Sequence, residues 1–90
     1  MKQNILTTRK ILHAISNERS QELFNFIAEG KSYNSLIQTV KMTPKQYYPR
    51  LAKLVQLDLV KKAGKTYVLT PFGSVIYETQ IILAIAVNKR

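Results

Sequence analysis

Basic side chains are concentrated between residues 41 and 65, where they could bind phosphate groups. Fourteen Lys and Arg against five Asp and Glu give the 90-residue chain a formal net charge of +9. Residues 41–65 hold seven of the basic residues and one acid, Asp58, so this segment carries +6 of that charge. Clustered cations attract phosphates and release their counterions. The segment therefore indicates a polyanion-binding surface, with an ordinary solubilising face as the alternative.

Few other side chains could carry out catalysis or hold a metal ion. The chain has no cysteine, which excludes disulfides and thiolate ligands. His13 is its only histidine, and the five acids show no metal-ligand spacing. With three glycines, it also lacks a phosphate-cradling loop. We therefore expect no catalytic residue, no metal, no cofactor and no enzymatic activity.

The length and hydropathy of the chain fit a single domain over residues 1–90. Hydrophobic residues make up 46% of the sequence, enough for one small core. The longest unbroken apolar stretch, IILAIAV at 81–87, is far shorter than the roughly 20 residues needed to span a membrane. We expect a cytoplasmic, nucleoid-associated protein.

Two short helices in direct succession are predicted over about residues 33–56. Ser32 can cap the first helix, and Thr43, Pro44 and Gln46 form a capping box with proline at the first helical position. Pro49 then lies inside the second helix, where proline ordinarily costs about 3 kcal/mol or more. A helix, a tight connection and a second helix make a helix-turn-helix arrangement.

A hairpin and a long helix are predicted to complete the domain. The hairpin, over 59–69, is expected to have strands at 59–62 and 66–69 and a turn through residues 63–65. The final helix, over 71–88, begins with Thr70 and Pro71. Two further helices precede the pair, the second of them capped by Asn17 and ended by Gly30. The expected fold class is α+β, mostly α: a winged helix-turn-helix with a short β-hairpin wing and a long C-terminal helix.

Two stretches of the chain resemble known regulators. ILHAISNERSQELFNFIAEG is similar to the opening of ArsR-type regulators, and KQYYPRLAKLVQLDLVKKAGKTYVLTPFG resembles small archaeal winged-helix regulators. The resemblance covers about residues 11–77 and implies a winged-helix, DNA-binding protein. Asp58 stands where the family usually has glycine, and Pro49 where a small polar residue is more usual. Metal sensing is not implied, because the thiolate ligands of those sensors are missing.

The helix over 43–56 has one predicted core face and one predicted contact face. At about 100° per residue, Tyr47, Leu51, Leu54 and Val55 gather on the core side. Lysine and arginine on the other side could neutralise phosphates or reach guanine, and Gln46 could pair with adenine. The predicted DNA-binding residues are Thr43, Lys45, Gln46, Tyr48, Pro49, Arg50 and Lys53, with Lys61, Lys62 and Lys65 from the wing. Tyr48 could instead cover the helix edge, and the wing lysines could be merely solubilising.

The C-terminal helix is apolar on more than one side after Gln80. Phe72, Val75, Ile76 and Thr79 can face its own domain, but the rest of the apolar residues cannot do so at once. Antiparallel pairing with the same helix of a second subunit would bury them in a homodimer. The predicted dimerisation residues are Ile81, Ile82, Leu83, Ile85 and Val87. The alternatives are packing against the first helix of the same chain and, less favoured because the polar face is not basic, a membrane anchor.

These observations favour a double-stranded DNA-binding protein, a dimeric transcriptional regulator. The 43–56 helix would enter the major groove and the 59–69 wing would contact the backbone. Two alternatives stay open: a sequence-indifferent architectural or chromatin protein, and a winged-helix module that binds an acidic protein.

Overall fold

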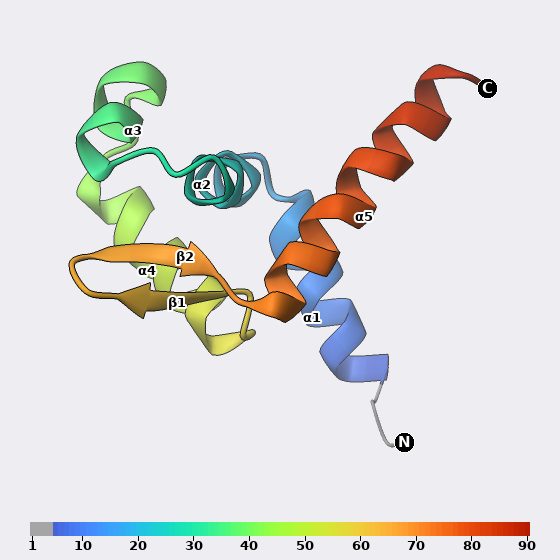
Figure 1. Ribbon diagram of the computed structural model, residues 1–90, viewed down its shortest axis with the longest axis horizontal. Coiled ribbons are helices and arrows are strands. Elements are labelled where there is room, and N and C mark those ends of the chain that lie inside the picture. The colour runs from blue at the N-terminus through green and yellow to red at the C-terminus, as the bar shows by residue number, and fades with distance from the viewer. Residues whose placement is uncertain (1–4) are drawn as a thin grey trace.

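The protein is mostly helical, with one small antiparallel sheet (Figure 1). A computed structural model describes residues 5–90, with side chains from residue 8 onward except that of Val40. The helices are α1 (Ile5–Ser16), α2 (Glu18–Ala28), α3 (Tyr33–Val40), α4 (Pro44–Gln56) and α5 (Pro71–Asn88), and the strands are β1 (Val60–Ala63) and β2 (Thr66–Leu69). The expected class, α+β and mostly α, is confirmed.

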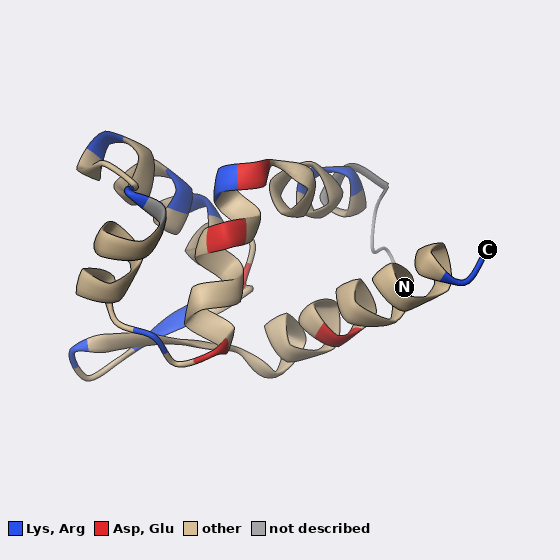
Figure 2. Cartoon of the chain, turned by 90° about the horizontal axis from the view of Figure 1, so that it is seen from above, with Lys and Arg blue, Asp and Glu red and all other residues tan. Residues whose placement is uncertain are grey.

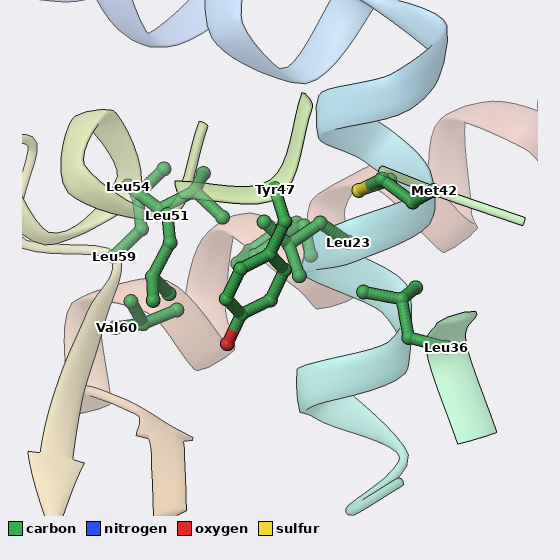
Figure 3. Close-up of a cluster of buried hydrophobic side chains, with 9 residues drawn as sticks. Leu23, Leu36, Met42, Tyr47, Leu51, Leu54, Leu59 and Val60 are labelled. Atoms are coloured by element: carbon green, nitrogen blue, oxygen red, sulfur yellow. The ribbon is translucent and has the colours of Figure 1, made fainter. Parts of the chain in front are cut away.

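The hydrophobic core lies where α2, α3 and α4 meet the start of β1 (Figure 3). Phe24 of α2 and Leu54 of α4 are completely buried, and Met42, in the connection between α3 and α4, is buried as well. The buried cluster comprises Leu23, Phe24, Leu36, Met42, Tyr47, Leu51, Leu54, Leu59 and Val60. Two successive helices are therefore fixed to one core, which holds the exposed side of α4 in a defined position.

The beginnings of α3 and α4 are capped as the sequence predicts. The Ser32 hydroxyl accepts the Ser35 amide, and the Thr43 hydroxyl accepts the Gln46 amide. The Gln46 side chain in turn accepts the Thr43 amide at 3.0 Å, which completes the capping box. Lys41, with φ of 54°, turns the chain between the two helices. These local hydrogen bonds stabilise the beginnings of α3 and α4 in addition to their contacts with the core.

Helices α2 and α4 end in the same hydrogen-bonded motif. At the end of α2, Gly30 has a φ of 73° and the Lys31 amide donates to the Phe26 carbonyl at 3.0 Å. At the end of α4, Asp58 has a φ of 64° and the Leu59 amide donates to the Leu54 carbonyl at 3.0 Å. This is the Schellman arrangement, whose left-handed position favours glycine. Asp58 therefore occupies a position where most side chains are strained.

The first strand of the hairpin begins and ends one residue later than the sequence predicts, whereas the second strand has the predicted bounds. The first strand is Val60–Ala63, not 59–62, and the turn consists of Gly64 and Lys65 alone because Ala63 pairs with Thr66. The Leu59 carbonyl accepts the Thr70 amide, but the Leu59 amide donates to the Leu54 carbonyl at the end of α4 and so does not take part in strand pairing. Gly64 has a φ of 65°, which the tight turn requires.

Only the first half of α5 packs on the domain. The Thr70 hydroxyl caps the helix by accepting the Gly73 amide at 2.8 Å, and it donates to the Asp58 carbonyl at 2.6 Å. A β-carbon at Gly73 would lie 1.9 Å from the Leu59 carbonyl oxygen, so the helix can approach this closely only with glycine. Tyr77 makes an edge-to-face contact with Phe24, at 6.0 Å between ring centroids. Beyond Gln80 the helix extends away from the domain (Figure 1).

The prediction of which α5 residues face the domain is partly wrong. Phe72 and Val75 are 41% and 59% exposed, and Thr79 is exposed as well. Gly73 is instead the buried residue, and Ile76 packs against the core as expected. The close approach at Gly73 sets the rotation of the helix, which the hydrophobic pattern alone does not reveal. No helix within residues 5–90 is long and apolar enough to cross a membrane.

Candidate nucleic-acid interface

The outer side of α4 is exposed and points away from the core. Lys45, Pro49 and Lys53, one helical turn apart, all lie on this side and are exposed. Helix α4 runs without interruption through Pro49, whose missing N–H leaves the Lys45 carbonyl without its usual helical donor. Val55, predicted for the core, is 43% exposed. It lies roughly 80° from Tyr47 around the helix, at the edge of the buried stripe.

Two of the predicted base-reading side chains are engaged within α4 itself. The Gln46 carboxamide oxygen accepts the Thr43 amide in the capping box. Bidentate pairing with adenine uses both ends of a carboxamide, so Gln46 could make it only by opening the cap. Arg50 is half-buried, and its Nη1 donates to the Gln46 carbonyl at 3.0 Å. Neither side chain extends freely from the helix, whereas Lys45 and Lys53 make no such bond.

A cluster of three tyrosines joins the beginnings of α3 and α4. The Tyr47 ring lies 4.6 Å from that of Tyr33 and 4.9 Å from that of Tyr48, between centroids. Tyr47 is buried, and desolvation raises the pKa of its hydroxyl. Tyr48 packs edge-on against Tyr47 yet is 59% exposed. It therefore covers the helix edge and still presents its ring to solvent.

The hairpin lysines surround the hairpin rather than sharing one face. Lys61 and Lys62 are consecutive in β1, so their side chains leave opposite faces of the sheet. Lys65 lies in the two-residue turn at the tip. All three are exposed. A ligand that contacts one face and the tip would meet Lys65 and one of the two strand lysines.

Most of the acids lie on or beside α2, whereas α4 and the hairpin carry mainly cations (Figure 2). Three of the five acids, Glu18, Glu22 and Glu29, lie in or directly after α2, and a fourth, Glu78, is in α5. Two of the α2 acids form salt bridges, with Arg19 and with Lys31. No cation of α4 or of the hairpin has such a carboxylate partner among the described residues. The exposed lysines of α4 and the hairpin are therefore available to an external anion.

Helix α1 contributes basic residues that the sequence prediction omitted. Arg9, Lys10 and His13 line a cavity of about 410 Å³ together with residues of α4. The omission has a simple cause: α1 and α4 line the same cavity only in the folded chain, and no spacing within either helix reveals this. No group of three or more His, Asp and Glu that could hold a metal ion occurs in the described part of the chain.

A second hollow, of about 460 Å³, lies between the hairpin and the loop that joins α2 to α3. Tyr33, Tyr47 and Tyr67 contribute to its lining, as does Lys65 from the hairpin tip. Two members of the tyrosine cluster, Tyr33 and Tyr47, therefore line the hollow beside the hairpin.

The second half of α5 carries an uncovered apolar surface. The five predicted dimerisation residues are between 44% and 66% exposed: Ile81, Ile82, Leu83, Ile85 and Val87. All residues from 81 to 90 are exposed. The alternative in which this segment packs along α1 of the same chain is therefore not the arrangement of the structure.

Comparisons with protein-family models, with curated proteins and with solved structures found no match to this chain.

Proposed function

We propose that the protein is a double-stranded DNA-binding regulator of the winged helix-turn-helix type, acting as a homodimer. The observation that carries the proposal is the accumulation of unpaired cations on the outer side of α4 and on the adjoining hairpin. Residues 41–65 hold a net +6, and none of their basic side chains is paired with a described carboxylate. Such a surface gains affinity for a polyanion by releasing its counterions.

In this proposal α4 lies in the major groove. An α-helix with its side chains is about 10–12 Å wide, and the groove is about 12 Å wide. Lys45 and Tyr48, near the N-terminal end of α4, would approach the bases, and Lys53 would meet a phosphate. Lys65 and one strand lysine would bind the backbone, which positions the protein without reading sequence.

The dimer would form through the exposed half of α5, paired with the same segment of a second copy. A helix that is apolar all round is normally buried all round, and residues 81–87 are exposed. A two-fold dimer would present two α4 helices to half-sites about 34 Å apart.

A sequence-indifferent architectural role is the second candidate, and one observation favours it. Gln46 and Arg50, two of the side chains best suited to base readout, are held in hydrogen bonds within α4. A surface of lysines alone would bind phosphates with little preference for sequence.

Selection of bound duplexes from a random DNA pool, followed by competition with random DNA, tests the proposal. A regulator enriches a defined motif, arranged as two half-sites, and binds it at least about a thousandfold more tightly than random DNA. A specificity ratio near one supports the architectural role instead. Absence of any complex with duplex DNA contradicts both and favours an acidic protein partner.

A further inference from the structure

The cavity between α1 and α4 is lined by basic side chains from both helices. Its volume of about 410 Å³ falls within the range of small-molecule sites, roughly 300–1,000 Å³. Arg9, Lys10 and His13 line it from α1, and Arg50 and Lys53 from α4. No aspartate or glutamate is among the lining residues. Four permanent cations therefore surround one hollow without a counter-charge from the protein.

The like charges repel one another across the hollow, although Arg9, Lys10 and Lys53 are exposed and therefore screened by water and salt. The Nε of Arg50 is buried and has no hydrogen-bond partner among the described residues, whereas Nη1 of the same side chain donates to the Gln46 carbonyl. A bound anion would offset the repulsion and could accept charge-assisted hydrogen bonds from the exposed basic side chains.

The cavity also has an apolar wall. Ala14 of α1 and Pro49 of α4 line it, and the aliphatic stems of lysine and arginine add apolar surface behind their charges. A bare inorganic anion would leave this wall in contact with water. The lining fits a ligand with a small apolar body and a strongly anionic group.

We propose that the α1–α4 cavity binds a small organic phosphate monoester. A phosphate dianion suits a site with two arginines and two lysines, because its oxygens accept several charge-assisted hydrogen bonds at once. The apolar body of the ligand would lie against Ala14 and Pro49.

One consequence rests on the proposed DNA-binding function. Pro49, Arg50 and Lys53 belong both to the cavity lining and to the predicted DNA-binding residues. A ligand that neutralises the two basic residues would weaken DNA binding, and DNA would weaken ligand binding by the same factor.

Calorimetric titration of the full chain with phenyl phosphate, in the absence of DNA, tests the cavity directly. The expected result is saturable binding of one ligand per chain, with the largest amide chemical-shift changes in α1 and α4. Benzyl alcohol, which keeps the ring but lacks the charge, should not bind. Inorganic phosphate should bind more weakly than phenyl phosphate, and equal affinity would overturn the role of the apolar wall.

Paired variants separate a built site from general electrostatic attraction. Arg9→Gln/Lys10→Gln should weaken phenyl phosphate binding by about tenfold or more. Lys89→Gln/Arg90→Gln removes the same charge at the exposed end of the chain and should leave it unchanged. Equal losses in both pairs, or shift changes centred on α5, would overturn the proposal.

The same variants distinguish the cavity from a DNA contact. If free protein binds no phenyl phosphate while Arg9→Gln/Lys10→Gln weakens duplex binding, these cations are backbone contacts and the ligand proposal is wrong. Because the calorimetric measurement contains no DNA, its failure leaves the DNA-binding proposal standing. If the protein binds phenyl phosphate but no duplex DNA, the ligand proposal stands and the DNA-binding proposal is wrong.

Discussion

Asp58 shows how one residue connects the end of α4 to the hairpin and α5. Its φ of 64° places it in the region that favours glycine, and Gly30 holds the equivalent position at the end of α2. The Asp58 carbonyl also accepts the Thr70 hydroxyl, so this strained position anchors the cap of α5. Its carboxylate lies at the C-terminal end of a helix, where negative charge is unfavourable.

Asp58→Gly is therefore expected to stabilise the fold, by up to about 1 kcal/mol. Relief of the left-handed strain outweighs the extra entropy of glycine in the unfolded chain. Chemical denaturation measures the free energy of unfolding. Gly30→Ala is the matched control and should destabilise the protein by about 1–2 kcal/mol. A loss of stability in Asp58→Gly would show that the carboxylate makes a favourable interaction.

Gln46 has two assigned roles, and one substitution separates them. In Gln46→Glu a carboxylate still accepts the Thr43 amide and suits the positive end of the helix, so the stability of α4 should be kept. The new negative charge and the loss of the amide donor should lower affinity for duplex DNA by about tenfold or more.

Thermal melting and DNA binding of Gln46→Glu are measured together, with Gln46→Ala for comparison. The alanine variant should lose the cap and some stability. If Gln46→Glu leaves both DNA affinity and sequence preference unchanged, Gln46 does not contact DNA.

At the scale of elements, local signals predict the ends of helices well. Thr43, Pro44 and Gln46 begin α4 as the sequence indicates, and Thr70 caps α5, because capping depends on residues within one turn. The rotation of α5 was not predictable in the same way. It depends on the contact between Gly73 and the Leu59 backbone, two segments brought together only by the hairpin.

In the candidate site, too, local features could be predicted from the sequence and tertiary contacts could not. Periodicity assigned Tyr47, Leu51 and Leu54 to the core side of α4 correctly, so the outer face could be listed from sequence. The α1 side of the cavity could not, since it arises from tertiary packing. The engagement of Arg50 with a backbone carbonyl is also a matter of side-chain conformation, which spacing does not fix.

Pro49→Ser should stabilise α4. Serine restores an N–H that can donate to the Lys45 carbonyl and removes the crowding of the ring, a gain of about 1–3 kcal/mol. Pro44→Ser is the matched control, because an N–H at the first helical position has no helical acceptor; its effect should be small. Denaturation curves of the two variants decide the matter. If the Pro49 variant gains no stability, α4 already accommodates the ring without cost.

At the scale of the whole molecule, α5 gives the chain a surface that a second copy would cover. Ile82→Glu should convert a dimer into a monomer, because each two-fold contact would then bury a charge. Sedimentation equilibrium measures the mass. Val68→Glu, on the exposed part of the hairpin, should leave the association unchanged. A wild-type protein that is monomeric at high micromolar concentration rules out the proposed dimer.

The central claim is that the cations of α4 and the hairpin bind duplex DNA, and the salt dependence of the affinity tests it most directly. Fluorescence anisotropy with a labelled duplex should show log K falling linearly with log salt, by about 0.9 for each phosphate neutralised. Lys65→Ala should reduce this slope by about one contact, whereas Lys89→Ala should leave it unchanged. An affinity for duplex DNA that is undetectable, or that does not depend on salt, would contradict the account.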